Sequence, residues 1–112
     1  MFFRKEINPY SVSDRVRFRN IDQTIDLEVK AQASSIVLGI KQAQDKLSKI
    51  NDNSSDEDRL ESAMAFAEVI FGKEQAEKLL AFYKNDSLAV IKSCGMYFSQ
   101  RLAKLITKAQ KR

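Results

Sequence analysis

The stretch AEVIFGKEQAEKLLAFYKND, residues 67–86, decides how the helices of this chain are joined. A lone glycine, Gly72, stands between two amphipathic patterns and is followed by Lys73 and Glu74. A phosphate-binding loop needs several glycines, whose N–H groups surround phosphates, and a Ser or Thr after its lysine. This stretch has neither. We therefore predict that Gly72 is the left-handed residue that ends one helix and that Lys73 begins the next.

The helices around this corner belong to a series of four. Apolar residues recur at three- and four-residue steps, which is typical of amphipathic helices. Ser55 followed by Asp58 resembles a capping box, and Asn85–Ser87 reads as a turn and a cap. We predict helices over about residues 31–50, 56–71, 73–84 and 88–110. The stripe expected to be buried on the last helix is Leu88, Ile91, Gly95, Phe98, Leu102, Leu105 and Ala109.

The chain before the helices has the period of β-strands. VRFRN (residues 16–20) and TIDLEVK (24–30) alternate apolar and polar residues around a short polar break. We predict a hairpin over about residues 15–30, after a flexible arm at residues 1–13, and one domain over 14–112. The fold class is therefore mainly α: a short N-terminal β-hairpin followed by four helices in a small bundle. The basic strand can offer an edge to another chain, or its charges can prevent such pairing.

The composition narrows the classes of function. The chain has 112 residues, no histidine and one cysteine, so cysteine–histidine zinc sites, histidine relays and internal disulfides are excluded. The acidic residues lack the EF-hand spacing. We expect no enzyme activity, no cofactor and no metal. We also expect no membrane span or signal peptide and a location in a reducing cytoplasm.

Charge is distributed unevenly along the chain. Residues 1–20 carry +3, residues 21–91 carry −5 and residues 92–112 carry +6, which gives the net charge of +4. On the last helix Arg101, Lys104 and Lys108 are expected to share one side. This basic face can bind phosphates of nucleic acid or an acidic protein patch, or it is a solvated face beside the helix C-terminus. In the same helix we expect Cys94 to be partly buried and Gly95 to permit close approach of a neighbouring helix.

This order of elements resembles a known family. The hairpin VRFRNIDQTIDLEV, the acidic linker and the segment AFAEVIFGKEQAEKLLAFYKND are similar to the small tail assembly chaperones of long-tailed phages and prophages of Gram-positive bacteria. Gly72, Glu77, Leu80 and Tyr83 stand at the positions of that family's apolar-glycine corner and following helix. The resemblance covers about residues 16–110. The strongly basic C-terminus departs from it, because many members are acidic.

The resemblance implies a non-enzymatic protein that binds the tape-measure protein during tail assembly. It implies that the bound chaperone keeps the long, helical tape-measure protein soluble until tail-tube subunits surround it. Many members of the chaperone family also have a longer form made by ribosomal frameshifting. An apolar groove between helices would hold the partner. A homo-oligomer through the last helix is also consistent with the pattern. The alternative function is a small nucleic-acid-binding regulator that uses the basic helix; nucleic acid is the less favoured partner.

Aromatic residues are the partner-contact candidates, because such side chains supply much of the energy of protein interfaces. For each one taken singly, ordinary core packing is the competing interpretation. The candidates are Phe66, Phe71, Tyr83, Tyr97 and Phe98.

Overall fold

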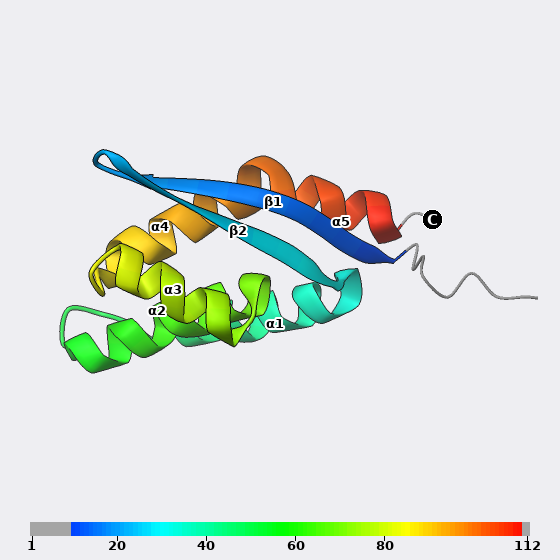
Figure 1. Ribbon diagram of the computed structural model, residues 1–112. Helices are drawn as coiled ribbons and strands as arrows, with labels where there is room; N and C mark the ends of the chain where they lie inside the picture. Colours follow the sequence, from blue (N-terminus) through cyan, green and yellow to red (C-terminus); the bar gives the residue numbers. More distant parts are fainter. Residues whose placement is uncertain (1–9, 111–112) are drawn as a thin grey trace, which may run out of the picture.

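A computed structural model describes residues 10–110 and shows a β-hairpin lying across a group of helices (Figure 1). The predicted fold class is confirmed: a two-stranded antiparallel hairpin precedes four helical segments, the last of which has three parts. The elements are β1 Ser11–Asn20, β2 Gln23–Gln32, α1 Ala33–Leu47, α2 Asp56–Phe71, α3 Lys73–Phe82, α4 Ser87–Tyr97, η1 Phe98–Leu102 and α5 Ala103–Gln110.

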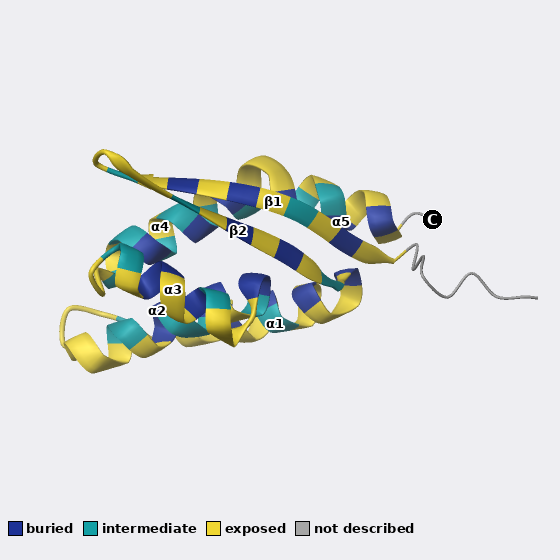
Figure 2. Cartoon of the chain, viewed as in Figure 1, coloured by how far each residue is buried: buried dark blue, intermediate teal, exposed yellow. Residues whose placement is uncertain are grey.

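The hairpin covers the helices with one face and leaves the other exposed. Asn20 pairs with Gln23 across a two-residue turn, and from there the strands alternate between buried and exposed residues (Figure 2). β2 contacts α1, α2 and α3, whereas β1 contacts α5. β1 begins at Ser11, and Val12 continues its buried face. The expected flexible arm is therefore wrong at residues 11–13. Residues 1–9 of that arm lie outside the described residues.

Helix α2 occupies the centre of the bundle and packs against α1, α3 and α4. It packs closely against α1 at Gly39, where an added Cβ atom would lie 2.6 Å from Cγ1 of Val69. Close packing had been expected at Gly95, but a Cβ atom there would meet nothing within 4 Å. That expectation is wrong: the glycine that permits helix–helix contact is Gly39.

Gly72 forms the corner between α2 and α3 on its own. It is the C-cap of α2 and the N-cap of α3, which confirms the predicted boundary. Its φ of 83° is positive, but its ψ of 164° lies outside the left-handed helical region that we expected. Essentially only glycine adopts this combination, so the corner needs Gly72 for a backbone reason. The other predicted caps are confirmed, since Ser55 accepts from the Asp58 N–H and Asp86 from the Ala89 N–H.

A π-turn in the last helical segment changes which face is buried. The predicted stripe is wrong at its start, because Leu88 is 68% exposed. Leu102 and Ala109 are buried as predicted, whereas the other buried residues, Val90, Cys94, Tyr97 and Ile106, each lie one position from the predicted stripe. The five-residue step from Tyr97 to Leu102 coincides with η1, where the backbone bonds span one residue more than in an α-helix. The turn therefore moves the buried face by one position, which a constant α-helical period does not predict.

Candidate protein-binding surface

An acidic side chain occupies the helix-facing side of β1. Asp14 lies between the buried Val12 and Val16 in the alternation, and its side chain is only 7% exposed. Its Oδ2 accepts from Tyr97 Oη and from Arg101 Nε, both at 2.7 Å, and its Oδ1 accepts from Arg101 Nη2 at 2.9 Å. The sequence prediction started the hairpin one residue too late to recognise Asp14 as an inward position.

These hydrogen bonds lower the pKa of Asp14. The Arg101 guanidinium is the largest cause, burial opposes it, and the Tyr97 hydroxyl and the backbone N–H of Arg15 lower the pKa further. Burial raises the pKa of Tyr97, and its hydrogen bond to Asp14 adds to that effect. Asp14 thus holds Arg101 in a bidentate ion pair. Arg101, one of the predicted basic-face residues, is therefore engaged within the fold.

The five aromatic candidates fall into different environments. Phe66, Phe71 and Tyr97 are buried in the core, which is the competing interpretation left open by the sequence. The Phe71 and Tyr97 rings are stacked with centroids 6.0 Å apart. Tyr83 is half-buried, and its hydroxyl donates to the Arg19 carbonyl at 3.3 Å, so it holds the hairpin tip. Phe98 is also half-buried, and unlike the core aromatics it lines a groove.

That groove runs between α1 and the η1–α5 segment and has a volume of about 290 Å³. Val37 and Phe98 supply partly exposed apolar surface, and Ile106 lies beneath them, 5% exposed. Val37 is 39% exposed. The lining residues are Val37, Ile40, Lys41, Gln44, Phe98, Ala103, Ile106 and Thr107.

A second hollow of about 470 Å³ follows α5 itself. Its lining residues are Ala103, Lys104, Leu105, Thr107 and Lys108. Ala103 and Thr107 line both hollows, so they lie at the boundary between them, which we call the ridge. We call the two hollows and this ridge the α1–α5 surface. Neither hollow has an acidic residue among the described residues that line it.

The charged residues of the α1–α5 surface are all basic. Lys104 and Lys108, the remaining predicted basic-face residues, are exposed, as is Lys41 on α1. Within residues 10–110, no carboxylate lies within ion-pair distance of these three lysines. The sequence prediction missed Lys41, because only the packing of α5 beside α1 brings it to this surface.

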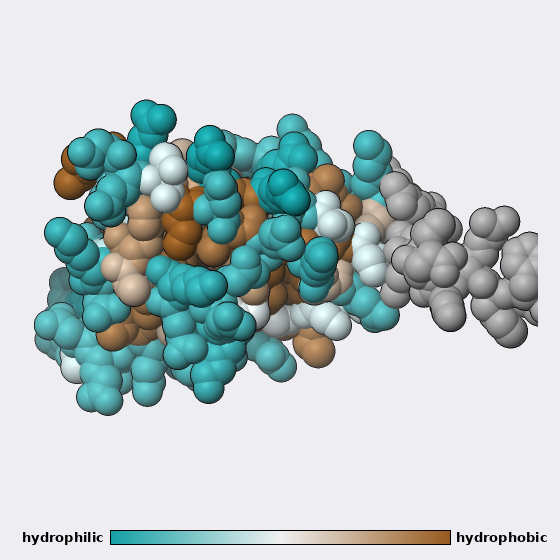
Figure 3. Space-filling model, in the orientation of Figure 1, coloured by the Kyte–Doolittle hydropathy of each residue, from teal (hydrophilic) through white to brown (hydrophobic). Residues whose placement is uncertain are grey.

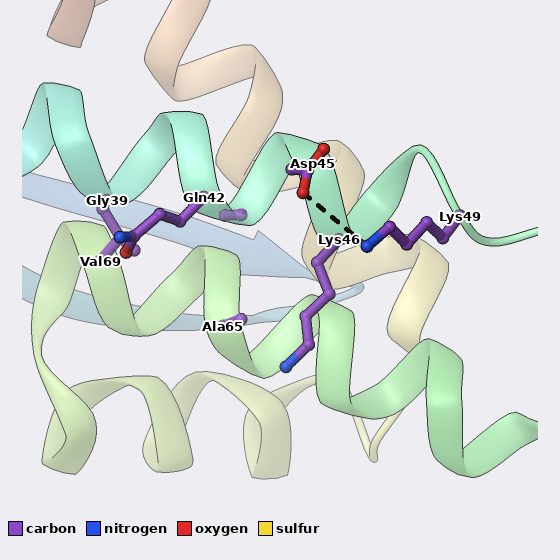
Figure 4. A pocket seen from close by; sticks show the side chains of 8 residues that line it. Gly39, Gln42, Asp45, Lys46, Lys49, Ala65 and Val69 are labelled. Atoms are coloured by element: carbon purple, nitrogen blue, oxygen red, sulfur yellow. Dashed lines mark ion pairs between the residues drawn. The ribbon is translucent and has the colours of Figure 1, made fainter.

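Another groove, of about 400 Å³, lies between α1 and α2 (Figure 4). Its floor includes Gly39, Ala65 and Val69, and an ion pair of 3.8 Å between Lys49 and Asp45 lies at its edge. This groove therefore combines small residues with charges of both signs. It offers less apolar side-chain surface to a partner than the groove beside Phe98.

The described residues show little that indicates reaction chemistry. Over residues 10–110, no cluster of three acidic, Cys or His side chains is placed to hold a metal ion, and no helix is long and apolar enough to cross a membrane. Burial raises the pKa of the Cys94 thiol to about 12, which disfavours the reactive thiolate. The view in Figure 3 shows mainly hydrophilic side chains, with separate patches of apolar surface between them.

Comparisons of the chain with protein-family models, with curated proteins and with solved structures found no match. An apolar groove between two helices, bordered by side chains of one charge, is a surface suited to protein recognition.

Proposed function

We propose that this protein is a non-enzymatic assembly chaperone that binds apolar helical segments of a phage tape-measure protein in the bacterial cytoplasm. The observation that carries the proposal is the groove beside Phe98, where partly exposed apolar side chains from α1 and η1 meet. Grooves of this kind bind the apolar face of an amphipathic helix. Covering that face would keep a long helical chain from aggregating until its assembly partners replace the chaperone.

The family resemblance supports the proposal through the architecture. Gly72 forms the α2–α3 corner, Leu80 is buried, and Tyr83 holds the hairpin tip. These residues therefore act on the shape of the bundle. The binding itself is assigned to a different part of the chain, the α1–α5 surface.

Co-expression with a tape-measure fragment tests this function. The wild-type chain should increase the soluble fraction of the fragment, measured in cleared lysate. Val37→Glu should abolish that effect, because it places a charge in the apolar groove. Leu38→Glu is the matched control, since Leu38 is 60% exposed on the same helix and does not line the groove. If the fragment precipitates equally with and without the wild-type chain, the proposed function is wrong.

A further inference from the structure

We infer that the α1–α5 surface binds an amphipathic helix whose apolar stripe is bordered on both sides by acidic residues. This inference rests on the proposed function and specifies the chemistry of the partner segment. Three features of the surface support it: the ridge, apolar side chains beside it, and lysines on both of its sides.

The ridge allows a helix to approach α5 closely. Ala103 and Thr107 are four residues apart on α5, so their small side chains lie one above the other along the helix. Small residues at such positions let two helix backbones come close together. On the α1 side of the ridge, Val37 and Phe98 are available to contact the apolar stripe of the bound helix.

The lysines specify the charge of the bound helix. Lys41 lies on the α1 side of the ridge, and Lys104 and Lys108 line the hollow on α5. A helix seated on the ridge would have basic side chains along both of its flanks. Acidic flanks would be attracted there, whereas basic flanks would be repelled. Arg101 is not part of this set, because Asp14 already holds it.

A second copy of the chain fits this surface less well. The acidic first turn of α2, residues Asp56, Glu57 and Asp58, is the densest group of carboxylates that a second copy could supply. Unless the second copy returns the same contact about a two-fold axis, a contact between α2 of one copy and α5 of another would propagate into a ring or an open chain. A separate partner helix requires no such assembly.

The test uses two synthetic helical peptides with the same leucine stripe, one with glutamate flanks and one with lysine flanks. Fluorescence anisotropy measures their dissociation constants for the full chain at low salt. The glutamate peptide should bind the wild-type chain. Its dissociation constant for the K104E/K108E variant should be about tenfold higher, as expected for the loss of two exposed charge pairs. The same variant should gain affinity for the lysine peptide.

The control variant is K73E/K84E, which makes the same change in net charge at exposed lysines outside both hollows. Equal weakening by the two double variants would overturn the inference, because it would show an effect of overall charge. Duplex DNA that binds more tightly than the glutamate peptide at the same salt would also overturn it. So would a stable oligomer, measured by sedimentation, that the peptide does not dissociate.

The inference and the proposed function can fail separately. If wild type and K104E/K108E solubilise the tape-measure fragment equally and bind the glutamate peptide equally, the function stands and the charge rule is wrong. If the glutamate peptide binds as described but the fragment still precipitates, the charge rule stands and the tape-measure function is wrong.

Discussion

The hydroxyl of Tyr97 donates to the carboxylate of Asp14 over 2.7 Å, although the two residues are 83 positions apart in the chain. This bond joins the first strand to the junction of α4 and η1, directly before the π-turn. Arg101, within that turn, binds the same carboxylate. The three side chains thus connect the N-terminal hairpin to the helix segment that presents Phe98, Lys104 and Lys108.

Asp14→Asn should lower the free energy of unfolding by about 1–2 kcal/mol at pH 7, because the charged acceptor of Tyr97 and Arg101 is lost. The pKa of Asp14 is lower in the folded chain than its ordinary value of 3.8. Its stabilising effect is therefore present above about pH 4 and is lost as the pH falls through the folded pKa. Urea unfolding of both chains at pH 7 and in steps below pH 4 should show their difference shrinking.

Asp26→Asn is the control for this pH dependence. Asp26 pairs with Arg17 on the exposed face of the hairpin, where water screens the interaction. Asp26→Asn should therefore lower the free energy of unfolding at pH 7 by less than Asp14→Asn does. A difference between wild type and Asp14→Asn that stays constant down to acid pH would contradict the role assigned to the carboxylate.

The parts of the fold that follow local chemistry could be predicted from the sequence. The α2 boundaries at Asp56 and Phe71 follow from the Ser55 cap and from Gly72, and the hairpin turn follows from the strand alternation. The buried face of the last helix was predicted correctly at Leu102 and Ala109 but not before them, because a π-turn breaks the constant period on which that prediction depends.

The candidate site was only partly predictable for a related reason. Lys104 and Lys108 could be placed on one side of a helix by their spacing, and Phe98 was a candidate by residue type. Whether an aromatic residue fills the core or lines a groove depends on packing between distant elements. Lys41 and Val37 join the surface only because α1 lies beside α5.

Gly72 borders α2, and Gly95 lies within α4. Replacing each with alanine should change the free energy of unfolding in opposite directions. Gly72→Ala should lower the free energy of unfolding by about 1–3 kcal/mol, because alanine is strained at the backbone angles of Gly72 although its Cβ atom has free space. Gly95→Ala should raise it by up to about 1 kcal/mol, since Gly95 is helical and its new Cβ atom would meet nothing within 4 Å. Thermal unfolding of both variants shows whether each one is more or less stable than wild type. Changes in the same direction would contradict these backbone assignments.

Gly39→Ala should destabilise the chain by about 1–3 kcal/mol through overpacking against Val69. The valine side chain is branched at Cβ and has little freedom to move away. Val69→Ala removes the two methyl groups that lie 2.6 and 2.9 Å from the new atom. The double variant should therefore lose less stability than the sum of the two single variants, as measured in a double-mutant cycle of urea unfolding. Additive effects would show that α1 and α2 can separate at this crossing at low cost.

Gln75 closes the free edge of β2, and its removal should open that edge. Its Oε1 accepts from the Glu28 N–H at 2.8 Å, and its Nε2 donates to the Glu28 carbonyl at 2.7 Å, so one amide takes the place of a neighbouring strand. Gln75→Ala should speed amide hydrogen exchange at Glu28 and lower the free energy of unfolding by about 1–2 kcal/mol, because these backbone groups lose their partner.

Since an open edge invites pairing between chains, the variant should also associate more at high concentration, measured by sedimentation. Gln42→Ala, at an exposed position on α1, controls for the loss of a glutamine side chain. Unchanged exchange at Glu28 in Gln75→Ala would show that the amide does not protect this edge.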